Sequence, residues 1–485
     1  MMSNQTQGSA RNRINAILDD NSFVEIGALV TARSTNFNLQ QKDTPTDGVI
    51  TGYGVIDGNL VYVYSQEPEV LNGSIGEMHA KKISNLYDLA LKVGAPVIGL
   101  IDCAGIRIQE ATDALNGFGQ IYLKQTLASG VIPQITAIYG QCGGGLALFP
   151  TLTDFTFMEE KEAKLFVNSP NVLEKNYDSK LDTATSKFQS EQAGLVDFVG
   201  DEQSIATGIR QLITMFPSNN QDDASNDTCN DDLNRLCSEI ENVAGDTALV
   251  LSNLADNNIL VEVKANHGKS MVTGFIKLNG ATIGAVANRS EIYDNEGKLS
   301  EKFDAVITAE GAQKAAEFIT FCDAFGIPIL SLTNTKGFEA TVESEKKISK
   351  AVGKLTYAFA NSTVPKVNVI IGDSLGSAYI IMNSKSIGAD IVFAWPTATV
   401  GMMDATMAAK IIYADEISKS EDSSAFISEK ATKYNELQSS VEAAASRGYI
   451  DTIIEAVDTR KYVIAAFEML FAKREDRPAK KHGTV

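Results

Sequence analysis

Two short turns rich in glycine and other small residues are places where the backbone itself could do chemistry. Each follows an apolar run, at 134–140 and at 366–372, and precedes a segment expected to be helical. The turn residues are Gly143, Gly144 and Gly145 in the first case and Gly376, Ser377 and Ala378 in the second. Glycine lets a ligand approach the backbone closely, and the first N–H groups of a helix carry partial positive charge. Each turn could therefore hold a carbonyl oxygen that gains negative charge during a reaction.

A glycine-rich turn can also serve tight packing alone, so its position in the chain matters. The spacing from Gly144 to Gly376 is identical to the spacing from Gly105 to Gly337. It also separates the prolines that begin matched apolar runs, which are Pro96 with Pro328 and Pro133 with Pro365. A constant spacing indicates an internal duplication. The matched positions favour a binding role for both turns.

The duplication extends toward the N-terminal end of each half. Asp19 is matched by Asp256, at a spacing slightly longer than that of the turns, and Gly58 by Gly280, at a slightly shorter one. The changed spacing places insertions in loops between matched elements, where added length costs little free energy.

Short runs rich in valine and isoleucine alternate with amphipathic stretches. Helices are predicted at 79–94 and 312–326, where apolar residues recur every three or four positions. Buried strands are predicted at 96–102, 134–140, 154–158, 328–334, 366–372 and 390–396. The alternation predicts an α/β architecture with helices packed on the sheets.

Bulk properties limit the classes of protein that this chain can represent. Its 485 residues, 44% of them hydrophobic, can form two substantial cores. The absence of a long uninterrupted apolar stretch and of an apolar N-terminal segment predicts a cytoplasmic protein. Five scattered cysteines without a CxxC pair argue against a zinc site or a disulfide framework, so no metal is expected. A net charge of −19 argues against nucleic acid as a partner.

A polar, acidic stretch separates the two halves. Residues 217–233 contain few apolar side chains and are predicted to form a linker. The prediction is an N-terminal domain at 1–216 and a C-terminal domain at 234–485.

One further set of stretches spans almost the whole chain and comprises 47–58, 73–83, 92–110, 128–145, 152–158, 271–280, 321–330, 363–396 and the tail 478–483. These stretches resemble the carboxyltransferase subunits of biotin-dependent acyl-CoA carboxylases and decarboxylases. That group includes propionyl-CoA carboxylase beta and methylmalonyl-CoA decarboxylase alpha subunits. The resemblance implies two tandem crotonase-like domains of ββα superhelix type, which arose by internal duplication.

The resemblance also implies a reaction and a division of roles. Family members move a carboxyl group between N-carboxybiotin and the α-carbon of a short-chain acyl-CoA. The turn at Gly144 and Gly145 is expected to hold the thioester oxyanion, and the turn at Ser377 and Ala378 the ureido oxygen of biotin. The site is expected to form between the N-terminal domain of one subunit and the C-terminal domain of another, commonly in a hexamer built as a trimer of dimers.

Further side chains are expected to bind substrate. The candidates are Gly143 and Gly376, which belong to the two turns, and Gly105, Gly337 and Phe338, which come earlier in each half. Ile380 is expected either to line the acyl pocket or to pack in the core. Arg107 and Lys385 are candidates for the coenzyme A phosphates, with salt-bridged or solvated roles as the alternative.

Histidine does not supply an obvious base. A packing or capping role is expected for His79, and solvated positions are expected for His267 and His482. The reaction implied by the resemblance needs no side-chain nucleophile, because two oxyanion holes stabilise the two enolates.

The chain departs from the family pattern at three places. Cys103-Ala104-Gly105 replaces a serine-glycine-glycine run, and Cys103 is expected to be a small buried residue. Ser377 stands where many members have glycine. Residues 339–350 differ from the usual glycine-rich run, which puts the biotin-side contacts and the exact substrate in question.

No biotin-attachment sequence and no P-loop are present, so biotin is expected on a partner carrier protein. The expected partners are a biotin carboxyl carrier protein with either a biotin carboxylase or a membrane decarboxylase subunit, which would set the direction of transfer. Two alternatives remain. One is a non-catalytic scaffold subunit, and the other is a biotin-independent crotonase-type hydratase or isomerase. The acyl group is left open between propionyl/methylmalonyl, acetyl/malonyl and glutaconyl, with a three-carbon group expected first.

Overall fold

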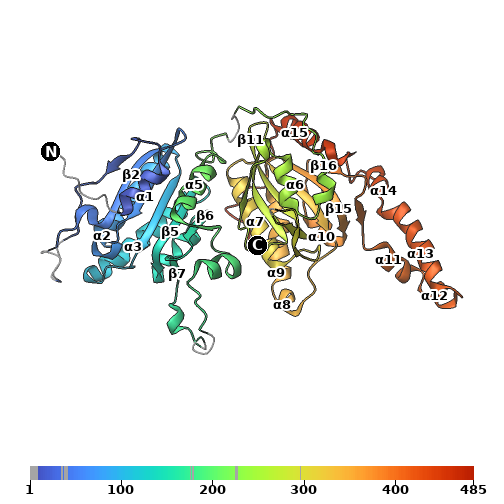
Figure 1. The fold of residues 1–485 in the computed structure, drawn as a ribbon, viewed down its shortest axis with the longest axis horizontal. Helices are drawn as coiled ribbons and strands as arrows, with labels where there is room; N and C mark the ends of the chain where they lie inside the picture. The colour runs from blue at the N-terminus through green and yellow to red at the C-terminus, as the bar shows by residue number, and fades with distance from the viewer. Residues whose placement is uncertain are drawn as a thin grey trace. The chain divides into compact units, whose positions relative to one another are not determined.

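The computed structural model describes residues 9–33, 37, 42–174, 176, 180–223, 228–294 and 296–485. The chain divides into two compact units, Met1–Asp223 (unit 1) and Ala224–Val485 (unit 2). The division falls inside the stretch 217–233, and the finer domain limits drawn from the sequence stay a prediction. Figure 1 shows that both units are built from a sheet and helices.

Unit 1 is organised around one mixed sheet. The strand order is β1-β2-β3-β4-β5-β6-β8, and β7 pairs with the far end of β5. The first three strands are antiparallel, and those from β3 to β8 run parallel. The bounds are β1 Val24–Ile26, β2 Val49–Ile56, β3 Asn59–Gln66, β4 Val97–Cys103, β5 Gln134–Gly143, β6 Phe155–Glu159, β7 Lys164–Phe166 and β8 Phe198–Gly200.

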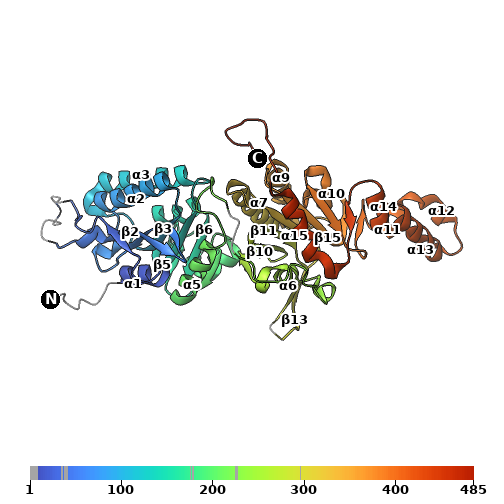
Figure 2. The same cartoon turned by 90° about the horizontal axis from the view of Figure 1, so that it is seen from above.

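Helices cover both faces of this sheet, as Figure 2 shows. Helices α2 (Glu77–Val93) and α3 (Ala111–Ala128) lie side by side on one face, and α1 (Ser9–Ile17) and α5 (Glu202–Ile213) lie on the other. The main core joins apolar side chains of α2 and α3 to those of the central strands. Parallel strands are buried on both faces in this way, which explains why their sequences are nearly continuous apolar runs.

Unit 2 repeats the layout of unit 1. Its strand order is β18-β16-β15-β14-β11-β10-β9, with β17 paired to the far end of β15. The bounds are β9 Leu260–Val263, β10 Met271–Leu278, β11 Ala281–Asn288, β14 Ile329–Thr335, β15 Lys366–Leu375, β16 Ile391–Ala394, β17 Thr399–Gly401 and β18 Thr452–Ile453. A separate hairpin joins β12 (Glu291–Tyr293) to β13 (Leu299–Lys302). The internal duplication predicted from the spacing is confirmed by this repeated strand order.

The helices of unit 2 also match those of unit 1. Helices α7 (Ala309–Ala324) and α9 (Ile348–Asn361) take the places of α2 and α3, and α6 (Thr247–Leu254) and α15 (Thr459–Leu470) those of α1 and α5. Two short helices, α8 (Val342–Glu345) and α10 (Gly376–Ile381), lie near the ends of the central strands.

A helical arm extends from unit 2 between β17 and β18 (Figure 1). It contains α11 (Ala405–Ile412), α12 (Ala414–Lys419) and α13 (Ser423–Tyr434), and α14 (Val441–Ser446) lies at its return. No residue of α12 or α13 is buried. In the part of the chain that the structure describes, no helix is long and apolar enough to cross a membrane.

The predicted helices and strands are found close to their expected positions. The helix expected at 79–94 begins two residues earlier, at Glu77, and the helix at 312–326 begins at Ala309 because Thr308 caps it. Thr308 Oγ1 accepts a hydrogen bond from the backbone N–H of Gly311 at 3.0 Å. The cap is a short-range signal that the apolar periodicity does not contain.

An arginine near the end of each unit ties its last helix to its first. Arg210 donates to the backbone oxygen of Ile17 (2.9 Å) and to Asp19 (2.8 Å). Arg460 bonds in the same way to the backbone oxygen of Leu254 and to Asp256, whose carboxylate lies 2.7 Å away. The two arginines differ in burial, since the side chain of Arg460 is 0% exposed and that of Arg210 is 28% exposed.

A buried histidine fixes the start of α2. His79 Nδ1 donates to the backbone oxygen of Asp47 at 2.9 Å, and Nε2 accepts from the Gln66 side chain at 3.2 Å. Asp47 also accepts a hydrogen bond from the backbone N–H of His79 at 2.7 Å. Burial, with the nearby Arg107 charge adding to it, holds the pKa of His79 well below 6.5. The expected packing role of His79 is the one that the structure shows.

Substituting the buried arginine should destabilise the protein more than substituting its exposed counterpart. Arg460→Met removes one partner of a buried ion pair, which costs about 3–5 kcal/mol of unfolding free energy. Arg210→Met should cost markedly less, because water screens that pair. Hydrogen exchange on both variants would give the stability of each unit separately. Equal losses in the two variants would contradict this account.

The buried histidine should make stability depend on pH. Because the pKa of His79 is lower in the folded than in the unfolded chain, its contribution is present above about pH 6.5 and is lost as the pH falls. The expected slope is about 0.7 kcal/mol per pH unit at pH 6.5 and approaches about 1.4 kcal/mol per pH unit as the pH falls further. His79→Asn keeps a donor for the backbone oxygen of Asp47 and should remove this slope. Denaturant unfolding between pH 7.5 and 5.5 tests it, and an unchanged slope in the variant would refute the assignment.

Candidate active site

The first glycine turn lies where β5 ends. Gly144 has φ +63°, which is a left-handed conformation, and no atom lies within 4 Å of where its Cβ would be. A short 3-10 helix, Gly144–Leu148, follows directly. Tyr122 on α3 donates its hydroxyl proton to the backbone oxygen of Gly145 at 2.7 Å, which fixes that peptide. The turn is therefore open at Gly144, and the hydrogen bond from Tyr122 fixes it at Gly145.

A second loop of unit 1 lies beside this turn. It leaves β4 at Cys103, whose register partner on β5 is Cys142. Gly105 in this loop has φ +99° and open space at its Cβ position, so the backbone is accessible there too. The structure thus brings Gly105 and Gly143–Gly145 to neighbouring strand ends. The carboxyl ends of parallel strands are the usual place for a ligand site in an α/β sheet.

Cys103 is a support for this loop and not an exposed thiol. Its sulfur accepts a hydrogen bond from the backbone N–H of Gly105 at 3.2 Å, and the side chain is buried. Burial raises the pKa of Cys103 to about 12, so the group stays a neutral thiol. The expectation of a small buried residue agrees with this environment.

Arg107 is in an ion cluster inside unit 1. Its guanidinium lies 2.6 Å from a carboxylate oxygen of Asp47 and 2.8 Å from one of Glu110, and it is 1% exposed. It also donates to the backbone oxygen of Ser74 at 2.7 Å. All of these partners are protein groups, so the guanidinium is not placed to bind a coenzyme A phosphate. The salt-bridged alternative is what the structure shows, and Arg107 positions the loop that carries Gly105.

The second glycine turn lies where β15 ends, in unit 2. Gly376 has φ +62°, almost the value of Gly144, and begins α10. The structure places Ser377 at the surface and Ala378 in the core. The first N–H groups of a helix have no partner within the helix, so those of α10 lack an acceptor from the helix itself.

The loop beside the second turn repeats the backbone geometry of its counterpart. In unit 1, Ile75 N–H donates to the backbone oxygen of Gly105, and in unit 2, Ile307 N–H donates to that of Gly337, both at 2.9 Å. Gly337 has φ +153° and open space at its Cβ position. Phe338 forms a bridge to Ile307 and is half-buried. Gly337 and Gly376 therefore come together as Gly105 and Gly144 do.

Other predicted residues lie in less definite positions. Ile380, on α10, is 37% exposed, so it is not a core residue, and its expected place in the acyl pocket stays a prediction. Lys385 is bound to Asp451, with its ammonium 2.7 and 2.8 Å from the two carboxylate oxygens, which is the salt-bridged alternative. His482 is exposed in the C-terminal tail, and His267 is half-buried in a loop.

The segment 339–350 continues from this second loop into helical structure. Thr341 caps α8 by accepting a hydrogen bond from the backbone N–H of Ser344 at 3.0 Å, and α9 begins at Ile348. Among the described residues, no group of three or more His, Cys, Asp or Glu side chains is arranged to hold a metal ion.

A hollow of about 750 Å³ opens next to the first turn. Gln141 and Lys164, which are register partners on β5 and β7, are two of its lining residues. Lys180 also lines the hollow, and Lys164 forms an ion pair with Asp182 at 3.0 Å. Neither lysine is predictable from the sequence, because only the pairing of β7 with the end of β5 brings Lys164 beside the turn.

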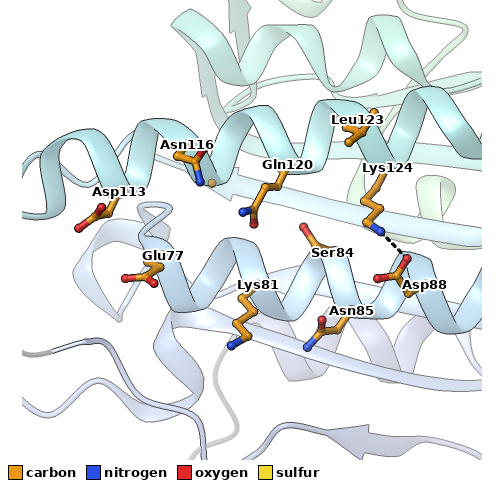
Figure 3. A pocket seen from close by; sticks show the side chains of 11 residues that line it. Glu77, Lys81, Ser84, Asn85, Asp88, Asp113, Asn116, Gln120, Leu123 and Lys124 are labelled. Carbon is orange, nitrogen blue, oxygen red and sulfur yellow. Dashed lines mark hydrogen bonds and ion pairs between the residues drawn. The ribbon is translucent and has the colours of Figure 1, made fainter.

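A second, smaller hollow lies along the outer surface of α2 and α3 and has a volume of about 380 Å³ (Figure 3). Its lining is polar and includes the ion pair of Lys124 with Asp88. Ser84 is nearly buried there, and its hydroxyl has no hydrogen-bond partner. All of the lining residues belong to α2 and α3 and none to a strand end, so this groove is separate from the candidate site.

The arrangement supplies backbone donors at two equivalent strand ends, each beside a glycine in the left-handed conformation. Such donors stabilise negative charge on oxygen, and they need no reorganisation as the charge develops. The chemistry that this geometry suits is the formation of an enolate or a similar oxyanion at each turn.

Comparison with known proteins agrees with this geometry. The family model described as carboxyl transferase domain matches residues 4–485. The chain is 38% identical to methylmalonyl-CoA decarboxylase subunit alpha of Propionigenium modestum and 39% identical to the carboxyltransferase subunit of propionyl-CoA carboxylase of Haloferax mediterranei. Each match covers 98% of this chain and 93% of the relative.

A solved structure shows the same fold over the full length. The transcarboxylase 12S structure, described as a hexamer assembly with hydrolysed methylmalonyl-coenzyme A bound, matches with a TM-score of 0.91 and 34% identity. The match covers 99% of this chain and 92% of that one. The expected duplicated crotonase-like fold is confirmed, and with it the expected family: the chain belongs to the carboxyl transferase family.

Proposed function

We propose that this chain transfers a carboxyl group between N-carboxybiotin on a partner carrier protein and the α-carbon of a short-chain acyl-CoA. The observation that carries the proposal is the pair of left-handed glycine turns at Gly144 and Gly376, each at the end of a central parallel strand. The names of the relatives support a propionyl- or methylmalonyl-type acyl group.

The two turns divide the chemistry between them. The N–H groups at Gly144 and Gly145 donate to the thioester oxygen as the α-carbon becomes an enolate, and those at Ser377 and Ala378 donate to the ureido oxygen of biotin. The ureido nitrogen carries the carboxyl group to or from the site. Tyr122 fixes the first turn from behind through the backbone oxygen of Gly145. Lys164 and Lys180 line the hollow beside this turn and are the candidates to meet the coenzyme A phosphates.

The proposal includes assembly with other subunits. A hexamer is supported by the description of the transcarboxylase 12S structure. Biotin would arrive on a separate carrier protein. Either a biotin carboxylase or a membrane decarboxylase subunit would complete the reaction cycle, and the second would hold this chain at a membrane surface.

The purified chain should remove the carboxyl group of an acyl-CoA only when free biotin is present. A panel of malonyl-, methylmalonyl- and glutaconyl-CoA, with release of the decarboxylated thioester as the readout, would identify the acyl group. Methylmalonyl-CoA is expected to be the best substrate. Turnover without biotin would support a hydratase or isomerase of the crotonase type. No turnover by a correctly assembled protein, with or without a biotin carrier protein, would support the scaffold alternative.

A branched side chain at the first turn should abolish transfer and leave the assembly intact. Gly144→Val forces a β-branched residue into a left-handed conformation. The backbone of the turn must therefore change, and its N–H groups no longer point toward the substrate oxygen. The expected loss of kcat is about a hundredfold or more. Light scattering should give the same oligomer as for the wild type.

A matched control is available in unit 1. Gly58 is also left-handed, with φ +82° and open space at its Cβ position, but it lies in the β2–β3 hairpin. Gly58→Val should therefore carry a similar backbone strain and keep its activity. Full activity in Gly144→Val would remove this turn from the mechanism.

A further inference from the structure

A charged pair lies beside the second turn and is not part of the machinery described so far. Lys336 Nζ is 3.4 Å from a carboxylate oxygen of Asp373, and the two side chains are 60% and 37% exposed. Lys336 directly precedes Gly337, and Asp373 comes three residues before Gly376. The pair therefore flanks both glycine positions of unit 2.

The pairing of the strands fixes this position. Thr335, the last residue of β14, is the register partner of Ser374 on β15. Lys336 N–H donates to the backbone oxygen of Ala305 at 2.7 Å, so the backbone is held where the lysine leaves the sheet. The side chain of Lys336 can therefore reach the end of β15 and the turn at Gly376.

Unit 1 has the same backbone and no charge at these positions. Ala104 and Gln141 are the counterparts of Lys336 and Asp373, at the same spacing as the matched glycines. Ala104 N–H donates to the backbone oxygen of Asn72 at 3.0 Å, as Lys336 N–H does to that of Ala305. The ammonium group is thus a specific property of the second turn and not a requirement of the fold.

We infer that Lys336 binds the carboxylate of N-carboxybiotin at the second turn. This inference rests on the proposed function, because it assigns biotin to the turn of unit 2. The carboxylate is an anion, and the net charge of −19 on the chain opposes its approach unless a local cation attracts it.

Lysine can serve this role while it keeps its partner. The ammonium has three donors, so it can contact Asp373 and a ligand carboxylate together. An exposed pair at 3.4 Å holds the lysine only weakly, which leaves it free to turn toward the ligand. Asp373 is a positioning residue in this arrangement.

Steady-state transfer to biotin methyl ester, whose side chain is neutral, tests the inference. Lys336→Met should lower kcat/KM for the biotin ester about tenfold or more, since a hydrogen bond to a charged group is lost, and should leave the KM for acyl-CoA unchanged. Lys336→Arg should recover most of the activity. Lys302→Met is the matched control, because Lys302 is also exposed and pairs with Glu291 at 3.2 Å on the β12–β13 hairpin. A Lys336→Met enzyme within twofold of wild type, or one altered only in the KM for acyl-CoA, would overturn the inference.

Calorimetry separates this inference from the proposed function. The probes are biotin methyl ester with a carboxymethyl group on the reactive ureido nitrogen and the neutral amide of the same compound. The wild type should bind the anionic probe about tenfold more tightly than the amide, and Lys336→Met should bind the two equally. Equal binding of both probes by the wild type would refute the lysine site. A lysine-dependent preference in a protein that transfers no carboxyl group would support the site and refute the proposed function.

Discussion

The structure depends on one constraint, which is that a central parallel strand must end in a residue with positive φ. Gly144 and Gly376 meet it with nearly equal angles, +63° and +62°. A side chain at these positions would strain the backbone, and at Gly376 a Cβ would also lie 3.3 Å from the backbone oxygen of Met402. The neighbouring strand, β4 in unit 1 and β14 in unit 2, places the loop with Gly105 or Gly337 at the same end of the sheet. The helices and the sheet serve to hold these two points of the backbone in place.

Rigidity comes from polar groups that are buried behind the loops. Arg107 joins Asp47 and Glu110 under the first loop, and Tyr122 holds the peptide of Gly145. In unit 2, a network of small polar side chains on β14 and β15 lies below the second turn, where Asn368 accepts hydrogen bonds from Ser331 and Thr333 at 3.0 and 2.8 Å. Buried networks of this kind favour one arrangement, because an unpaired member is costly.

The sequence predicted the strands, the two turns and the duplication well, because glycine, proline and apolar periodicity act over short distances. Its prediction for Arg107 was open between a phosphate and a salt bridge. The partner that decides it, Asp47, lies far earlier in the chain and is brought close only by the folded unit. Lys336 was not predicted for the same reason. Its position beside the second turn is set by the register of Thr335 with Ser374. Lys164 reaches the first turn only through the pairing of β7 with β5. The local backbone conformation can be predicted from the sequence, whereas the surroundings of a side chain can be known only from the tertiary structure.

The unequal spacings between the two halves have a consequence for engineering. The chain from Gly105 to Gly144 has the same length as the chain from Gly337 to Gly376, whereas the hairpin glycines Gly58 and Gly280 lie closer together than this repeat. Strand ends that must meet cannot shift past one another without moving a glycine out of place, whereas the connection from β11 to β14 is longer than the one from β3 to β4 and holds the additional β12–β13 hairpin. The β12–β13 hairpin, which has no counterpart in the described part of unit 1, is therefore a permissive point of this scaffold, where an epitope or a fused domain could be inserted. The chain from β4 to the first turn, and from β14 to the second, is the part whose length is fixed.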